Sequence, residues 1–176
     1  MITEEKALEL LEEHDLPEGI INHSKAVSSR ATEIAKRILQ ADEEVLRIAG
    51  LLHDIGKTKC IGNENNKPIK QHPAESGKIL RRLGEGRLAK LCESHSPKQL
   101  AENSLKKHSL EEKILILSDM QTMEKEQISL DERLEDLISR YPEETRYIKN
   151  IKRSIPKYKK IRREINSKMD RPKSTK

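Results

Sequence analysis

The strongest sign of chemistry in the sequence is an adjacent histidine and aspartate, His53 and Asp54. They follow a mainly apolar stretch, residues 45–52, and a glycine, Gly56, comes two residues after Asp54. A neighbouring imidazole and carboxylate can bind one divalent metal when the chain reverses direction after a helix, because both side chains then converge. The sequence therefore predicts a metal site at the end of a helix.

A second histidine-aspartate pair, His14 and Asp15, shows how little the dipeptide means by itself. It follows a short amphipathic segment, residues 7–11, and charged residues flank it. A histidine at the C-terminal end of a helix is favoured there by the helix dipole. We therefore interpret His14 as a helix-end residue and not as a ligand.

Four further residues with metal-binding side chains are expected on the inward side of a predicted helix or at its inward end. They are His23, His72, His95 and Asp119. One histidine on an apolar face is more often a hydrogen-bonded core residue than a ligand. Asp119 is harder to explain in that way, because a carboxylate inside the apolar run 114–120 carries a heavy desolvation cost unless it is paired or binds a metal.

The combined donor set points to first-row divalent ions. Imidazoles together with carboxylates suit Mn, Fe, Co, Ni or Zn better than the all-oxygen surroundings that Mg or Ca prefers. Two imidazoles and two carboxylates suffice for one ion. The remaining histidines, His72 and His95, can hold a second ion that shares one carboxylate, so the set suits one ion or two.

Helical periodicity runs through the first 140 residues, and no alternating strand pattern extends beyond a few residues. Capping boxes at Ser109 with Glu112 and at Ser129 with Glu132 mark two helix starts. Residues 58–71 are expected to form a polar loop. The expected helices that position the candidate ligands and the core cover residues 17–38, 42–54, 72–83, 88–95, 109–119 and 130–140.

The composition supports one small all-α domain. A chain of 176 residues is long enough for a single core, and without Trp or Phe that core must use Leu, Ile, Val and Ala, which favours helices. Two cysteines and no leader-like apolar stretch argue against a disulfide scaffold and against secretion. No apolar run approaches the roughly 20 residues of a membrane helix, so we expect a cytoplasmic protein without membrane contact.

Positive charge is concentrated at the C-terminal end. Residues 141–176 contain 13 of the 35 Lys and Arg but 4 of the 30 Asp and Glu, which gives them a charge of +9 and leaves −4 for residues 1–140. We expect a domain over residues 1–140 and a basic helical extension over 141–176 with a disordered end after about Asp170. A helix break is expected at Pro156, with packing on the core before it and exposure beyond it.

The order of the candidate ligands resembles that of the HD-domain superfamily of metal-dependent phosphohydrolases. The resemblance rests on His23, the pair His53 and Asp54, and the late Asp119, and the isoleucine and glycine after the pair are similar to the HDIG variety. It covers about residues 5–140 and extends to small archaeal HD proteins of uncharacterised function. It implies a compact helical bundle in which these four side chains surround one metal.

The resemblance also implies roles for the other candidates. In dinuclear members, the counterpart of Asp54 bridges to a second metal, which is held by histidines in the positions of His72 and His95. The family often has a basic residue shortly after the metal dipeptide, so Lys57 is the best candidate for contact with a phosphate.

Our leading hypothesis is a metal-dependent phosphohydrolase, a phosphomonoesterase or phosphodiesterase acting on a nucleotide or another small phosphate ester. The ions would activate a water molecule and stabilise the charge on the leaving oxygen. Asp54 would orient the hydroxide, and Lys57 would stabilise the transferring phosphoryl group. No Gly-Tyr-Pro triplet follows the site, which argues against the cyclic-dinucleotide phosphodiesterases that carry it.

The alternative is an RNA- or ribonucleoprotein-associated accessory module with a structural or vestigial metal site. Its basis is the basic tail, in which eight Lys and Arg lie between residues 149 and 163 and would attract a phosphate backbone. Aromatic residues that could stack on bases are few, namely Tyr141, Tyr147 and Tyr158, all in the tail. Nothing in the sequence indicates an oligomeric state.

Overall fold

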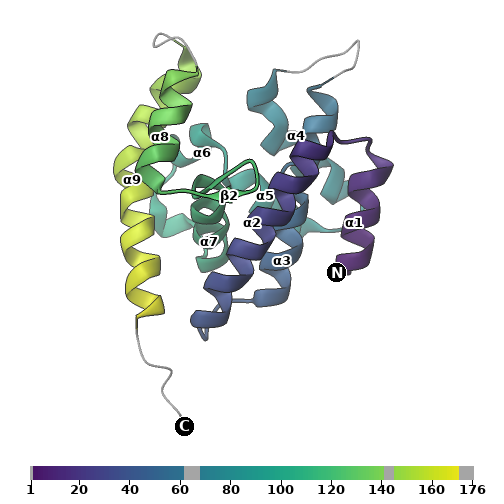
Figure 1. The fold of residues 1–176 in the computed structure, drawn as a ribbon, viewed down its shortest axis with the longest axis horizontal. Coiled ribbons are helices and arrows are strands. Elements are labelled where there is room, and N and C mark those ends of the chain that lie inside the picture. Colours follow the sequence, from purple (N-terminus) through teal and green to yellow (C-terminus); the bar gives the residue numbers. More distant parts are fainter. Residues whose placement is uncertain (1, 62–67, 141–144, 171–176) are drawn as a thin grey trace.

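A computed structural model describes residues 2–61, 68–140 and 145–170, and the fold is all-α apart from one very short hairpin (Figure 1). The α-helices of these ranges are α1 (Glu4–Glu13), α2 (Glu18–Arg37), α3 (Glu43–Leu52), α4 (His72–Arg82), α5 (Gly86–Ser94), α6 (Pro97–Glu102), α7 (Leu110–Met120), α8 (Leu130–Ser139) and α9 (Arg146–Met169). The short 3-10 turns are η1 (Ile55–Lys59), η2 (Ile69–Gln71) and η3 (Leu105–Lys107), and the antiparallel strands are β1 (Thr122–Met123) and β2 (Glu126–Gln127). The predicted all-α class is confirmed.

Side-chain caps fix the starts of α3 and α7, which position candidate ligands, and of α8. The Asp42 carboxylate accepts a hydrogen bond from the Val45 backbone N–H at 3.1 Å and so begins α3. Both predicted capping boxes are present, at the N-terminus of α7 and of α8. Helices α3 and α5 end just before His53 and His95, so these two histidines are C-cap residues.

The core lies between α2, α3 and α7, and these helices are close enough to bring their ligands together. Gly50 of α3 permits the closest approach, since a Cβ there would lie 2.4 Å from the Ser28 Cα of α2. On one side of this centre α4 packs on α5, and on another α8 and α9 lie side by side (Figure 1). The core side chains are mainly Leu, Ile, Val and Ala, as the composition predicts.

The predicted break at Pro156 is wrong, because α9 continues through this proline. Proline inside a helix removes one hydrogen bond and costs about 3 kcal/mol. Buried residues of α9 on both sides of Pro156, among them Ile151 and Tyr158, pack into the same core. Burial of each such side chain contributes about 1.5–3 kcal/mol, so the packing outweighs the lost hydrogen bond.

The predicted exposure beyond Pro156 is also wrong. Tyr158, Ile161 and Ile165 are all buried, and they continue the apolar stripe that begins at Ile148. Packing before Pro156 is as predicted, with Ile148 fully buried. The expected disorder after Asp170 concerns residues that lie outside the described ranges.

The segment after the histidine-aspartate pair is only partly an irregular loop. Residues 55–59 form η1 and residues 69–71 form η2, while 62–67 lie outside the described residues.

None of the helices in the described ranges combines the length and apolar character that crossing a bilayer requires.

Candidate metal centre

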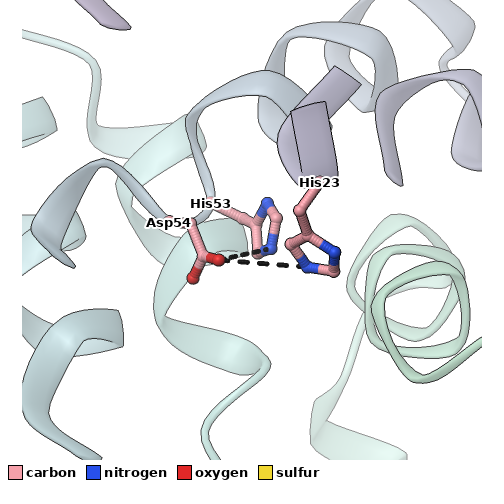
Figure 2. Close-up of side chains that lie close together, drawn as sticks. All are labelled: His23, His53 and Asp54. Carbon is pink, nitrogen blue, oxygen red and sulfur yellow. Dashed lines mark ion pairs between the residues drawn. The ribbon is translucent and has the colours of Figure 1, made fainter. Parts of the chain in front are cut away.

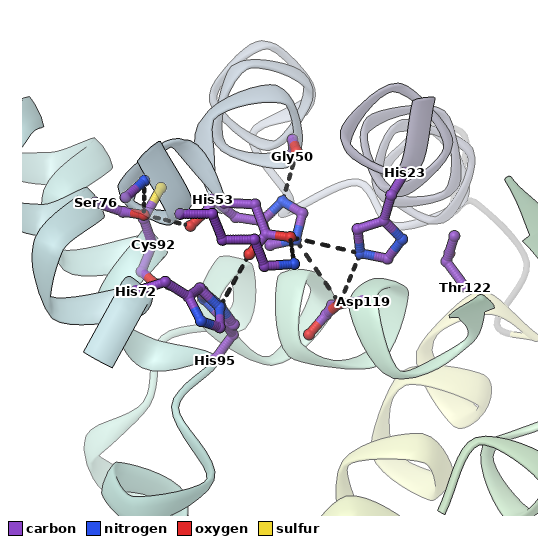
Figure 3. A network of polar contacts seen from close by, with 12 residues as sticks. His23, Gly50, His53, His72, Ser76, Cys92, His95, Asp119 and Thr122 are labelled. Carbon is purple, nitrogen blue, oxygen red and sulfur yellow. Dashed lines mark hydrogen bonds and ion pairs between the residues drawn. The ribbon is translucent and has the colours of Figure 1, made fainter. Parts of the chain in front are cut away.

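The structure brings all six candidate ligands to one place (Figure 3). They come from five separate helices or their ends, which are far apart in the sequence. The positions are His23 in α2, His53 and Asp54 at the end of α3, His72 at the start of α4, His95 at the end of α5 and Asp119 in the last turn of α7.

His23, His53 and Asp54 lie together in the first half of the cluster (Figure 2), and Asp119 lies beside His23. The His23 Nε2 atom lies 3.2 Å from the Asp119 Oδ1 atom and 3.9 Å from the Asp54 Oδ2 atom. The His53 Nε2 atom lies 3.4 Å from the same Asp54 oxygen and 3.7 Å from the same Asp119 oxygen. Two imidazole nitrogens therefore face two carboxylate oxygens across a small space.

His72 and His95 form the second half with the other oxygen of Asp54. The Asp54 Oδ1 atom lies 3.0 Å from His72 Nε2 and 3.8 Å from His95 Nε2. The two histidine Nε2 atoms are 2.9 Å apart. Asp54 thus faces the first group with Oδ2 and the second with Oδ1, which is the arrangement of a bridging carboxylate.

Each histidine of the cluster is oriented by a backbone carbonyl that faces its Nδ1 atom. A neutral ring that donates a hydrogen bond from Nδ1 keeps the lone pair of Nε2 free to bind a cation. All four Nε2 atoms point inward. The carbonyl partners are Glu124 for His23 at 3.1 Å, Gly50 for His53 at 2.8 Å, Ile69 for His72 at 2.6 Å and Cys92 for His95 at 2.5 Å.

Two observations show that this donor set fits a bound cation. The His53 Nε2 atom is buried and has no hydrogen-bond partner among the described residues. The Nε2 atoms of His72 and His95 lie 2.9 Å apart, and when both neutral rings carry their proton on the Nδ1 atom that faces a carbonyl, the two Nε2 lone pairs repel each other unless a cation lies beside them. Buried polar groups are normally paired, so a metal ion would satisfy atoms that the protein leaves unsatisfied.

The electrostatics of the cluster keep Asp54, Asp119 and His95 in the forms that bind metals. Burial raises the pKa of the Asp54 and Asp119 carboxyls, but the neighbouring histidines outweigh it and hold both pKa values well below the usual range. Burial, with His72 and His53 nearby, lowers the pKa of His95 to about 3, so this ring is neutral at neutral pH.

The two carboxylates also change the pKa of His53. Burial lowers its pKa, but Asp54 and Asp119 outweigh the burial, so the pKa lies above its usual value. A metal ion competes with such a proton for the same nitrogen.

A tight turn holds the histidine-aspartate pair against α4. The Ser76 hydroxyl donates to the His53 carbonyl at 2.7 Å and accepts from the Gly56 N–H at 2.9 Å. A Cβ at Gly56 would lie 2.3 Å from the His72 carbonyl oxygen and from the Ser76 nitrogen. The glycine of the Ile-Gly sequence is therefore needed for close packing, which places His72 beside Asp54.

Lys57 and His14 occupy different environments. The Lys57 ammonium lies 2.5 Å from the Asp54 Oδ2 atom and borders the cavity over the cluster.

His14 is the C-cap of α1, and its ring contacts the Leu10 carbonyl at 2.8 Å. His14 is thus a helix-end residue, as its sequence context indicates.

A cavity of about 360 Å³ opens over the cluster, and part of its wall was missed by sequence reasoning. The missed residues are Arg133 and Arg140 of α8 and its C-cap, with Tyr147 and Tyr158 of α9. The sequence shows only which helix stripe each of them adjoins, and not that they border a cavity. The two arginines are seven residues apart beside the apolar stripe of α8, and the tyrosines continue the apolar stripe of α9.

Comparison with known proteins settles the family. The HD domain matches residues 20–153, about three quarters of the chain. The chain belongs to the HD-domain family. Proteins of this family are generally metal-dependent hydrolases. The matched residues include those of the cluster and the first part of α9.

Two relatives are similar to part of this HD-domain chain. MJ0778, an uncharacterized protein of Methanocaldococcus jannaschii, is 38% identical over 96 residues, which are 52% of this chain and 52% of the relative. A protein of Thermoplasma volcanium named tRNA (cytidine(56)-2′-O)-methyltransferase is 34% identical over 93 residues, 52% of this chain and 25% of the relative. The matches thus span about half the length of the first relative and a quarter of the second. No solved structure matches the chain significantly.

Proposed function

We propose that this HD-domain protein is a metal-dependent phosphohydrolase that acts on a nucleotide or another small phosphate ester. The observation that carries the proposal is the cluster of inward-facing Nε2 atoms with the carboxylates of Asp54 and Asp119 beside an open cavity. Cationic side chains, including Lys57 and Lys70, border the same cavity. A site of this kind suits an anionic ester whose phosphoryl group reaches the cluster.

The proposed ligands divide into two groups that share Asp54. His23, His53 and Asp119 would hold one divalent ion, and His72 and His95 would hold another. When bound, such ions supply Lewis acidity, which lowers the pKa of water and stabilises negative charge on phosphoryl oxygens. The nitrogen-rich donor set favours Mn, Fe, Co, Ni or Zn over Mg.

Backbone carbonyls and charged side chains of the protein position the ligands and the substrate. The carbonyl contacts at Nδ1 hold the four rings in fixed orientations, so little reorganisation is needed when substrate binds. The Lys57 ammonium, beside Asp54, stabilises negative charge on the phosphoryl group. Asp54, whose two oxygens face the two halves of the cluster, would orient the attacking hydroxide. The scheme requires no serine or cysteine nucleophile.

The two histidine-aspartate pairs of the chain provide a matched test. Purified protein is assayed on a panel of phosphomonoesters and phosphodiesters with Mn, Co, Ni and Mg. The substitution Asp54→Asn is expected to lower kcat at least about 100-fold, as losses of electrostatic transition-state groups do. Asp15→Asn, in the pair at the end of α1, should leave kcat unchanged. Equal activity of the two variants would overturn the proposal.

The match to part of a tRNA-modifying relative favours a second candidate, an RNA-associated module. Under this alternative, the exposed lysines and arginines of α9 would contact RNA, and the metal site would be structural. Fluorescence anisotropy with labelled tRNA at several salt concentrations tests it, since each phosphate contact steepens the salt dependence. Tight, salt-dependent tRNA binding together with no hydrolysis of any ester would favour this candidate.

A further inference from the structure

We infer that the α8 side of the cavity binds a second phosphate group of the substrate, so that the preferred ester carries two phosphates. This inference rests on the proposed phosphohydrolase function and narrows its substrate class. Its residues are Arg133 and Arg140, which line the cavity together with the metal cluster.

Arg133 lines the cavity, and its side chain has an unused hydrogen-bond donor. Its side chain is 15% exposed, and its Nη1 atom donates to Asp136 at 2.8 Å. Its Nε atom is buried and has no hydrogen-bond partner among the described residues. Leaving a buried donor unpaired destabilises a protein. A phosphate oxygen is a suitable acceptor, because guanidinium groups bind phosphate through two adjacent N–H donors.

Asp136 holds the two arginines as a unit. Its Oδ2 atom accepts from Arg133, and its Oδ1 atom accepts from the Arg140 Nε atom at 2.7 Å. One carboxylate between two guanidinium groups leaves a net charge of +1 at this wall. The carboxylate also fixes both long side chains, which lowers the entropy that an anion must remove to bind them.

The position of this pair argues for a second phosphate and not for the one that is hydrolysed. The hydrolysed group already has Lys57, which lies beside Asp54 on the turn after α3. The arginines come from α8, which packs on α7 and α9 and so forms another wall. A cavity of about 360 Å³ is within the size range of sites for whole small molecules, so it has room for more than one phosphate.

The test measures binding and needs no catalysis. The as-purified, metal-containing protein is titrated calorimetrically with methylenediphosphonate and with methylphosphonate, two probes whose P–C bonds resist hydrolysis. Metal content is measured before and after each titration, so that chelation by the probe is detected. The variant is Arg133→Gln, and its matched control is Arg30→Gln. Arg30 also pairs with an acid at i+3, is 19% exposed and has a buried, unpartnered Nε, but it does not line the cavity.

Arg133→Gln is expected to weaken binding of the diphosphonate at least about tenfold and of the monophosphonate less than twofold. Arg30→Gln should change neither affinity. Equal losses for both probes would mean that Arg133 contacts the single phosphate at the metal cluster and would overturn the inference, as would unchanged diphosphonate affinity. If the titrations contradict the second phosphate site while the protein still hydrolyses esters, the proposed phosphohydrolase function stands. That function itself is tested only by the hydrolysis assay.

Discussion

The orientation of the histidine rings explains how this cluster can serve as a metal site. In each ring, one nitrogen contacts a backbone carbonyl and the other faces the centre. Most of these carbonyls belong to the same helix end or turn as the histidine, three residues away for His53, His72 and His95. Backbone geometry at helix ends therefore sets the direction of the Nε2 lone pairs before any ion binds.

Removal of one histidine tests the second half of the cluster. His95→Gln is expected to lower the content of bound divalent metal by about one ion per chain, because it removes one of the ligands that surround Asp54 Oδ1. His108→Gln is the control, since the His108 ring contacts the Ser104 carbonyl outside the cluster. Metal content is measured by inductively coupled plasma mass spectrometry after dialysis. Identical metal content in both variants would exclude His95 as a ligand.

The glycine after the pair has a structural role that thermal unfolding can measure. Gly56→Ala is expected to reduce the free energy of unfolding by about 1–3 kcal/mol, the usual cost of overpacking, because its Cβ would meet backbone atoms of α4 at 2.3 Å. Gly19→Ala is the control, as a Cβ there has no neighbour within 4 Å. If Gly56→Ala proves as stable as Gly19→Ala, the turn is not as closely packed as described.

At the residue scale, the candidate ligands could be predicted because polar residues on apolar helix faces are conspicuous. His23 and Asp119 are such residues, and their side chains meet at the cluster, with His23 Nε2 3.2 Å from Asp119 Oδ1. Arg133 could not be assigned in the same way. A long cationic side chain beside an apolar stripe is usual at the edge of any helix, and only the fold shows that this one borders a cavity.

At the scale of elements, helix starts were easier to predict than the course of α9. Capping boxes are local signals and mark α7 and α8 in the sequence. Pro156 is also a local signal, but its effect is outweighed by burial of residues such as Ile161, which lies in a core made by distant segments. The apolar stripe on both sides of Pro156 indicates the continuous helix that the structure shows, whereas the proline by itself indicates a break.

The structure gives Lys157 a role that its sequence context does not suggest. Its ammonium donates to the carbonyls of Leu100, Ala101 and Asn103 at 2.7–2.9 Å, at the C-terminal end of α6. A cation at this end of a helix satisfies free carbonyls and the helix dipole. Part of the tail's charge therefore stabilises the fold, and the same holds for Arg162, which pairs with Asp131 at 2.8 Å.

A pair of lysine substitutions in α9 tests this role. Lys157→Met is expected to lower the free energy of unfolding by about 1–3 kcal/mol, because three carbonyls lose a charged donor. Lys160→Met, at an exposed position in α9, should change it by less than about 0.5 kcal/mol. Urea denaturation of both variants gives the comparison. Equal stabilities would mean that the contacts with α6 contribute nothing.

At the scale of the whole molecule, the C-terminal helix belongs both to the core and to the cavity wall. Tyr158 is buried, lines the cavity and lies in the stripe that packs on the bundle. The sequence could indicate helicity and charge in this segment. It could not indicate which surface α9 covers, because that depends on packing against α6, α7 and α8 (Figure 1).

Truncation after Arg140 tests the joint role of this helix. Removal of residues 141–176 exposes the core side chains that pack on α9, each of which contributes about 1.5–3 kcal/mol. Together these contributions match the total stability of a typical domain, about 5–15 kcal/mol. The shortened chain is therefore expected to lose its cooperative thermal transition and its ester hydrolysis. An unchanged melting temperature with unchanged hydrolysis would show that α9 is an accessory arm.

The most direct test of the central claim is anomalous X-ray scattering from crystals of the full chain grown with Mn²⁺. We expect two manganese peaks in the cluster, one beside Asp119 and the other beside His95, with Asp54 between them. The contradictory result is an absence of peaks at these positions, or a single peak with His95 turned away from it.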